Sequence, residues 1–281
     1  MKFNGIFFAL IAAIFFGLIP STTKIAYNFG SNASLAILLR YFLAVLIISI
    51  PFFFVRKEFQ LIFKKFFELT LISFGSICLT AGLLLSVIYI PVSFVALIFY
   101  TYPLIILGYS YFNKNKLNKL QIIGFVAAFV GLGIALGPSF ENLNFIGIGL
   151  AFLAAIGAST VLIVNERLSQ HLNPIIINSF VNFFCLIFFG IIIYFKYTIE
   201  LPFNNIGWLF LISAALCYCL AFYMQILAVK NIGSTRTSLL LYIEPLVAII
   251  SAILLLNETL TILQIIGTAI VISSLVITSK K

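Results

Sequence analysis

The residue in this sequence whose type and position best suit chemistry is Glu244. The chain has no Asp, and among its seven Glu residues only Glu244 lies near the middle of a long apolar run. A carboxylate at that depth in a membrane costs about 2.5–3.5 kcal/mol unless it faces a wet cavity, finds a partner or takes up a proton. Glu244 could therefore bind a substrate amine or cation, carry a coupling proton, or hydrogen-bond a neighbouring helix.

Arg40 is the second charged candidate, because it also lies inside an apolar run. At a rise of 1.5 Å per residue, it would lie about 8 Å below the outer membrane surface. Extension of the long side chain outward to the lipid headgroups is the first expectation. The alternatives are that Arg40 reaches inward to pair with Glu244, or that it binds a substrate carboxylate.

Two prolines are expected to bend their helices at similar depth. Pro103 and Pro245 lie in the middle of apolar runs, whereas the other six prolines fall at the ends of runs or between them. A proline removes one helical hydrogen bond and kinks the helix. Both runs are therefore expected to kink and to expose a backbone carbonyl group inside the membrane.

Hydroxyl and aromatic side chains surround these prolines and recur on neighbouring runs. They could form a cavity of ring faces and hydroxyl groups that suits an amino acid, an aromatic metabolite or an organic cation. The remaining candidate substrate-binding residues are Phe16, Tyr100, Thr101, Tyr102, Ser159, Tyr218, Tyr223 and Tyr242. No motif predicts a catalytic residue, a metal site or a cofactor, and the four cysteines are expected to be inert apolar side chains.

The elements that must position these residues are membrane-spanning helices. Hydrophobic residues make up 63% of the 281 positions and charged residues only 8%, a composition that excludes a soluble or disordered domain. Each span needs about 20 apolar residues, and helices satisfy their own backbone in lipid. We expect ten spans, near residues 3–24, 34–55, 68–89, 92–112, 119–137, 144–164, 175–195, 206–228, 236–256 and 260–279.

The basic residues indicate how the spans are oriented. The net charge of +9 comes from residues in alternate loops, as topology signals do, so nucleic acid is not an expected partner. With both termini in the cytoplasm, only Lys24 and Lys196 lie outside and Arg40 lies within a span. We therefore expect a multi-pass protein of the cell membrane. The basic residues expected inside are Lys2, Arg56, Lys57, Lys64, Lys65, Lys114, Lys116, Lys119, Arg167, Lys230, Arg236, Lys280 and Lys281.

The two halves of the sequence repeat each other. Pro103 and Pro245 are 142 residues apart, as are small residues of the first and sixth spans, and a Gln-Ile-Ile-Gly motif at 121–124 recurs at 264–267. Glutamine occurs only five times, so this recurrence indicates a duplication. Each half, 1–140 and 143–281, would hold five spans. An odd number of spans makes the second half enter the membrane inverted, as in transporters with a midplane substrate site.

Several motifs resemble those of one transporter family. They are Tyr242-Ile243-Glu244-Pro245-Leu246, Leu256-Asn257-Glu258-Thr259-Leu260, Gln264-Ile265-Ile266-Gly267, Phe16-Gly17 with Lys24, and Arg40. With them the chain resembles the drug/metabolite transporter superfamily, specifically its EamA-type members. The first half departs from the pattern at Asn115, which holds the position matching Glu258. The resemblance implies ten helices in two inverted five-helix bundles around a central cavity, lined mainly by spans 1, 3, 4, 6, 8 and 9.

These observations predict an all-α polytopic membrane protein that is a secondary-active transporter and not an enzyme. No ATP-binding loop of the G-x-x-x-x-G-K-[ST] type occurs. The expected substrate is a small polar or amphiphilic metabolite, such as an amino acid or a related compound, moved by alternating access, with export as the expected direction. Import of a nutrient or organic cation is the first alternative, and a membrane-embedded lipid-modifying enzyme is the alternative from another class. The expected partners are the substrate and the lipid bilayer, with proton coupling and a monomer or homodimer left open.

Overall fold

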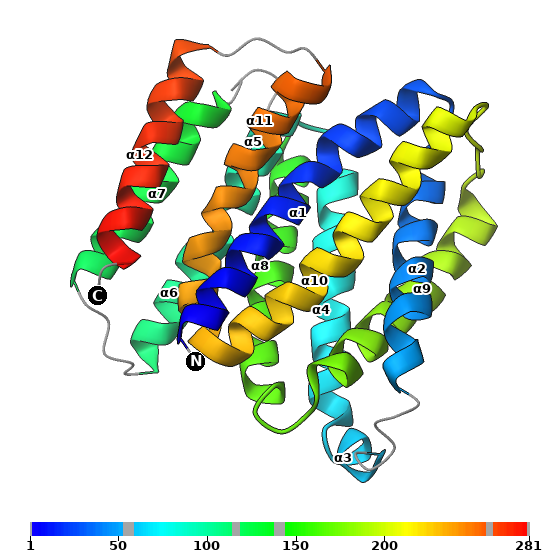
Figure 1. Ribbon diagram of the computed structural model, residues 1–281, viewed down its shortest axis with the longest axis horizontal. Coiled ribbons are helices and arrows are strands. Elements are labelled where there is room, and N and C mark those ends of the chain that lie inside the picture. The colour runs from blue at the N-terminus through cyan, green and yellow to red at the C-terminus, as the bar shows by residue number, and fades with distance from the viewer. Residues whose placement is uncertain (1, 53–58, 114–118, 138–143, 257–260, 280–281) are drawn as a thin grey trace.

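The computed structural model describes residues 2–52, 59–113, 119–137, 144–256 and 261–279, and they form a bundle of helices (Figure 1). Its elements are α1 (Lys2–Asn28), α2 (Ala33–Phe52), α3 (Phe59–Lys64), α4 (Phe66–Ser86), α5 (Val92–Phe99), α6 (Tyr102–Phe112), α7 (Lys119–Leu136), α8 (Phe145–Leu168), α9 (Pro174–Lys196), α10 (Asn205–Leu240), a 3₁₀ turn (Leu241–Ile243), α11 (Glu244–Leu256) and α12 (Ile262–Ser279).

Most of these helices are long and apolar enough to cross a membrane. Among the described residues, seven segments meet that criterion, and shorter apolar helices lie at Ala33–Ile47 and Ile262–Thr278. The prediction of an all-helical multi-pass protein is therefore confirmed. The count of ten spans stays a prediction, because Asn205–Leu256 forms one apolar segment and two helices are short. The seven are Phe3–Asn28, Phe66–Ser86, Val92–Phe112, Lys119–Leu136, Phe145–Leu168, Pro174–Lys196 and Asn205–Leu256.

Two of the expected spans are interrupted near their middle. The run 92–112 divides into α5 and α6, and the run 236–256 passes through the 3₁₀ turn into α11. Pro103 and Pro245 are each the second residue of the helix that follows, where a proline needs no hydrogen-bond acceptor for its missing N–H. These prolines thus begin new half-helices instead of kinking continuous ones.

The structure places Pro20 further from the end of its helix than the sequence predicted. α1 continues to Asn28, so Pro20 also lies inside a helix. The Thr22 hydroxyl donates to the Leu18 carbonyl oxygen at 2.9 Å, so this polar side chain is satisfied by the preceding turn of its own helix.

A glycine separates the eighth and ninth expected spans within α10. Gly233 has a φ of 81°, a left-handed conformation that favours glycine. Glu166 at the end of α8 accepts hydrogen bonds from the backbone N–H and the hydroxyl of Ser234. The carboxylate therefore caps the helical segment that begins after the glycine.

Contacts between the two halves follow the repeat. α1 packs on α10 and α4 packs on α8, contacts that are equivalent under the displacement of 142 residues. α7 and α12 lie side by side at one end of the bundle (Figure 1). A Cβ on Gly131 of α7 would lie 2.8 Å from Ile270 Cγ2 and 3.0 Å from the Gly267 carbonyl oxygen of α12. Small residues thus let these two helices approach closely.

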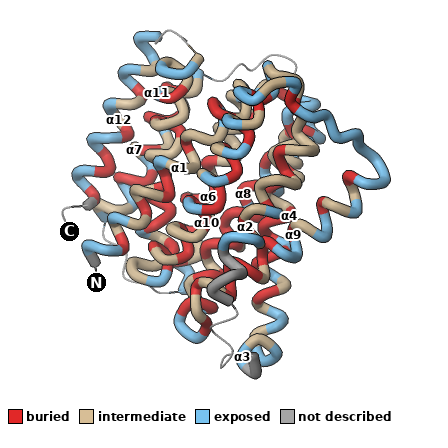
Figure 2. The backbone as a smooth tube through the Cα atoms, turned by 45° about the vertical axis from the view of Figure 1, so that its right-hand side comes forward, coloured by how far each residue is buried: buried red, intermediate tan, exposed pale blue. Residues whose placement is uncertain are grey.

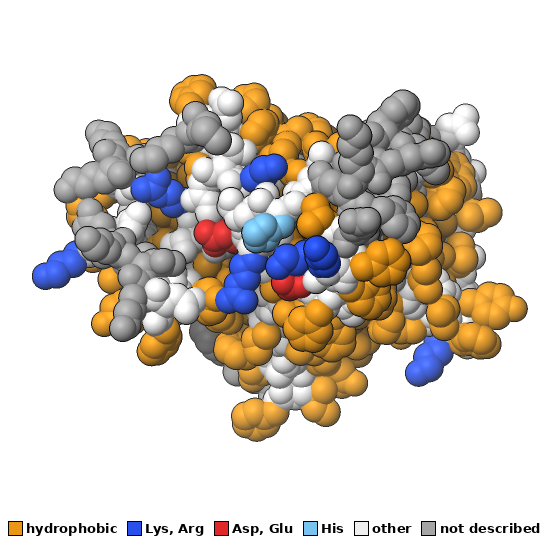
Figure 3. Space-filling model, turned by 90° about the horizontal axis from the view of Figure 1, so that it is seen from below, with side chains coloured by type: hydrophobic (Ala, Val, Ile, Leu, Met, Phe, Trp, Pro, Cys, Tyr) orange, Lys and Arg blue, Asp and Glu red, His pale blue; other side chains and the backbone are white. Residues whose placement is uncertain are grey.

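The outer surface of the bundle is largely apolar, and one end of the bundle carries a group of charged side chains. Buried residues face inward between the helices, and many exposed positions face outward (Figure 2); large apolar side chains such as Phe112 and Phe145 are 83% and 90% exposed. In the view from below, Lys and Arg side chains surround the single histidine, His171 (Figure 3). Such a surface suits lipid around the helices and water at the charged end. Arg56, Lys57, Lys114, Lys116, Lys280 and Lys281, with Asn115 and Glu258, lie outside the described residues.

Candidate functional site

A cavity of about 210 Å³ lies between the two halves. Its lining comes from α1, α2, α4, α5, α6, α8, α10, the 3₁₀ turn and α11. Phe16, Arg40, Tyr102, Tyr218 and Glu244 of the predicted set all line it. The structure therefore brings both charged candidates to one cavity. It also adds α2 to the spans that the resemblance implied.

The lining of this cavity is pseudo-symmetric. Most of its residues form pairs separated by 142 positions, which is the displacement of the repeat. The pairs are Phe16 and Ala158, Ile19 and Val161, Pro20 and Leu162, Ser76 and Tyr218, Thr80 and Phe222, Leu83 and Gln225, Phe99 and Leu241, and Tyr102 and Glu244. Only Arg40, Tyr41 and Leu79 line it without their counterparts. The halves thus contribute the same positions with different chemistry.

Glu244 begins α11 directly after the break in its span, and its side chain is partly exposed to the cavity. The Tyr100 side chain lies close to this carboxyl group. Tyr102, its counterpart in the first half, begins α6 at the equivalent break. A break in each helix is what lets these two polar side chains meet at the centre of the bundle.

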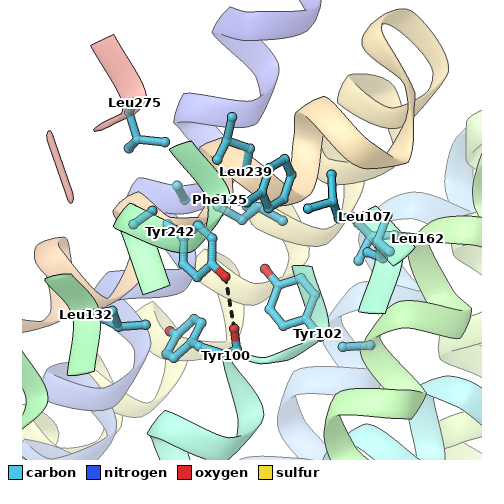
Figure 4. Packing of buried hydrophobic residues seen from close by; sticks show 14 of the residues in the cluster. Tyr100, Tyr102, Leu107, Phe125, Leu132, Leu162, Leu239, Tyr242 and Leu275 are labelled. Atoms are coloured by element: carbon cyan, nitrogen blue, oxygen red, sulfur yellow. Dashed lines mark hydrogen bonds between the residues drawn. The ribbon is translucent and has the colours of Figure 1, made fainter. Parts of the chain in front are cut away.

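Three tyrosines from the two breaks pack together beside this carboxylate. The Tyr242 hydroxyl donates to the Tyr100 carbonyl oxygen at 3.2 Å (Figure 4). The Tyr100 ring lies 6.3 Å from that of Tyr102 and 6.5 Å from that of Tyr242, measured between ring centroids. Tyr100 and Tyr242 belong to the buried core and support the cavity from behind.

Arg40 extends toward the cavity and not toward the outer surface. Its guanidinium carbon lies 5.1 Å from the centroid of the Tyr218 ring, a distance typical of a cation–π contact. The Tyr218 ring also contacts Tyr41 at 5.5 Å and Phe222 at 5.8 Å between centroids. Among the residues that the structure describes, no salt bridge joins Arg40 to Glu244, so pairing between them is not observed.

The remaining predicted residues do not line the cavity. Thr101 donates to the Ile98 carbonyl oxygen at 2.7 Å within the break. Ser159 donates to the carbonyl oxygens of Ala155 at 2.8 Å and Tyr102 at 3.2 Å. Tyr223 is partly exposed and lies outside the lining. Their places in the structure suit support of the helices, and a role in substrate binding stays a prediction.

Several polar lining residues were missed by the sequence reasoning. Ser76, Thr80 and Gln225 line the cavity, and Tyr41 joins them through a hydrogen bond of 2.8 Å between its hydroxyl and that of Thr80. The repeat itself held a signal for one of them, because Ser76 lies 142 positions before Tyr218. Thr80 and Gln225 pair with apolar residues, so their types alone did not single them out.

Each half-helix after a break packs on the first helix of the other half. At one contact, Ser21 and Ser251 share a hydrogen bond of 2.7 Å between α1 and α11. At the equivalent contact, Arg167 of α8 donates to the Tyr109 hydroxyl of α6. Gly17 meets the Glu244 carbonyl oxygen, just as its counterpart Ser159 meets that of Tyr102. These contacts close the bundle on either side of the cavity.

Comparison with known proteins agrees with this architecture. The EamA-like transporter family matches the chain over residues 3–137 and again over 145–280. A solved crystal structure is similar over 100% of this chain and 98% of its own length, with a TM-score of 0.83 and 14% sequence identity, which shows a shared fold. No curated protein matches the sequence.

Proposed function

Because the chain belongs to the EamA-like transporter family and is thus a membrane transporter of the drug/metabolite type, we propose that it moves an amino acid or a related zwitterionic metabolite. The transport is secondary-active and works by alternating access. In this proposal, the substrate binds in the cavity between the two halves.

One observation carries this proposal: Arg40 and Glu244 line the same cavity without a salt bridge between them. A cation and a carboxylate away from water are costly unless each has a partner. A zwitterion offers a carboxylate to Arg40 and an ammonium group to Glu244. Phe16, Tyr102 and Tyr218 also line the cavity and supply apolar and cation–π surface for the rest of the ligand.

The size of the cavity supports a single small metabolite. At about 210 Å³ it is smaller than the roughly 300–1,000 Å³ of sites for drug-sized ligands. Large multidrug or lipid cargo therefore does not suit this state of the protein.

Alternating access follows from the pseudo-symmetry of the halves. Two equivalent halves of opposite orientation can exchange shapes, so that the cavity opens on either side of the membrane in turn. In this proposal the Ser21–Ser251 contact closes the outer side and the Arg167–Tyr109 contact closes the cytoplasmic side. We further propose that both termini lie in the cytoplasm of a cell whose membrane holds the protein, and that net transport is export.

An organic cation is the second candidate substrate, because Glu244 and the tyrosine rings alone would suffice to bind an amine. Import of such a cation or of a nutrient uses the same cavity. The two candidate substrates differ in the carboxylate of the ligand. Only a ligand with a carboxylate requires Arg40.

Ligand-dependent thermal stabilisation of the purified protein tests the proposal. A ligand that binds the native state raises the melting temperature with its concentration. We expect amino acids to stabilise the protein more than their decarboxylated amines or the matching carboxylic acids. Stabilisation by amines alone would favour the organic cation, and stabilisation only by sugars or nucleotides would contradict both candidates.

A further inference from the structure

Asn182 of α9 is a buried amide that lies outside the cavity lining. Its side chain is fully buried and does not line the cavity. It lies 142 positions after Arg40, so the two residues hold equivalent places in the two halves. Polar side chains inside membrane spans are costly and commonly mark a function.

The hydrogen bonds of Asn182 fix the direction of its amide. The Nδ2 group donates to the Asn178 carbonyl oxygen at 2.8 Å, an atom that can only accept. The Oδ1 atom is therefore left to face Tyr218, whose hydroxyl donates to it at 3.2 Å. The Tyr218 hydroxyl is thus tied to a buried amide outside the cavity lining.

Tyr218 links this buried amide to the cavity. Its ring lines the cavity and lies under the Arg40 guanidinium at 5.1 Å. None of the residues that the structure describes accepts a hydrogen bond from that guanidinium. The ring face is therefore the contact that sets where the donors of Arg40 point.

We propose that Asn182 is a positioning residue for substrate recognition: it holds the Tyr218 hydroxyl, and the fixed ring directs Arg40 at the carboxylate of the substrate. The inference rests on the proposed function, because it assigns Arg40 to a substrate carboxylate. Asn182 touches no substrate itself. The equivalent positions thus have different roles in the two halves: Arg40 is the cation, and Asn182 orients the ring against which that cation packs.

The test compares ligands that differ only in the carboxylate. Each proteinogenic amino acid and its decarboxylated amine is titrated against the purified protein, with thermal stabilisation as the readout. Asn182→Ala removes the acceptor, and Tyr218→Phe removes the donor while keeping the ring. Ser179→Ala is the matched control, because this neighbouring hydroxyl on α9 is buried and has no hydrogen-bond partner among the described residues.

We expect Asn182→Ala and Tyr218→Phe each to weaken amino-acid binding by about tenfold, the size of one lost hydrogen bond, and to weaken amine binding clearly less, because an amine has no carboxylate for Arg40. The double variant should lose no more than either single variant, because both remove one interaction. Ser179→Ala should change neither ligand.

Other outcomes overturn the inference. If Asn182→Ala weakened the binding of amino acids and amines equally, Asn182 would serve helix packing alone. The same conclusion would follow if the losses of amino-acid affinity in the two single variants added up in the double variant. If Asn182→Ala does not fold, the same comparison with Tyr218→Phe decides. Absence of amino-acid binding by the unaltered protein would overturn the proposed function together with this inference, whereas amino-acid binding that the variants leave unchanged would overturn this inference alone.

Discussion

The Tyr242 hydroxyl donates a hydrogen bond to the Tyr100 carbonyl oxygen across 3.2 Å, between two residues that hold the same position in the two halves. Each tyrosine lies two residues before the start of the next half-helix, at Tyr102 in one half and Glu244 in the other. The prolines Pro103 and Pro245 follow one residue later. The bond therefore ties one break to the other at the centre of the bundle. The two interrupted helices are therefore linked directly to each other beside the cavity.

Replacement of Tyr242 by Phe should weaken this link without emptying the core. The ring remains, and the lost hydrogen bond should cost about 0.5–1.5 kcal/mol of stability. The melting temperature in detergent measures the effect. Tyr223→Phe is the control, because Tyr223 is partly exposed and lies outside the cavity lining. An equal melting temperature for Tyr242→Phe and the unaltered protein would show that the bond does not stabilise the breaks.

Glu244→Gln should abolish most substrate binding while keeping the shape of the side chain. Loss of a charged hydrogen bond of about 1.5–3 kcal/mol corresponds to a loss of roughly tenfold to more than a hundredfold in affinity. The concentration dependence of uptake into proteoliposomes, for an amino acid that is shown to bind, measures this loss of affinity at several pH values. If Glu244 carries the coupling proton, the variant should also lose its dependence on pH.

The control for that experiment is Glu200→Gln, since Glu200 is exposed outside the helices. Transport by Glu244→Gln that matches this control, with the same pH profile, would exclude Glu244 as a substrate or proton site.

Gly17→Ala should push α11 away from α1. A Cβ at this position would lie 2.5 Å from the Glu244 carbonyl oxygen and 2.6 Å from Val247 Cβ, and crowding of this kind typically costs about 1–3 kcal/mol. We expect a lower melting temperature and reduced transport. Gly149→Ala in α8 has nothing within 4 Å of its added Cβ and should be neutral. Equal behaviour of the two variants would show that the close approach at Gly17 is not needed.

A disulfide between α1 and α11 should lock the transporter. The hydroxyl oxygens of Ser21 and Ser251 lie 2.7 Å apart, so cysteines at both positions are close enough to be joined by an oxidant. Transport should stop on oxidation and return on reduction, because the contact on this side must open in each cycle. Either cysteine alone is the control for the four native cysteines. Full transport with the cross-link formed would contradict a moving contact here.

Composition and hydrophobic runs predicted the helical membrane fold, because lipid requires backbone groups to be satisfied within each span. The rarity of charge likewise predicted Glu244 and Arg40, since few residue types are so costly in lipid. The direction of Arg40 was not predictable, because snorkelling and inward packing require only different side-chain angles. Asn182 and Thr80 were missed for a related reason: a polar residue on an apolar helix shows its partners only once the helices pack.

Counterflow into proteoliposomes tests the central claim most directly. Vesicles loaded with an excess of an unlabelled amino acid that stabilises the protein receive a trace of the labelled compound outside. A carrier with Arg40 and Glu244 in one alternating site should give transient accumulation of label above equilibrium, which Arg40→Gln and Glu244→Gln should each abolish. Linear, unsaturable flux without accumulation, or accumulation that both variants leave intact, would contradict the account.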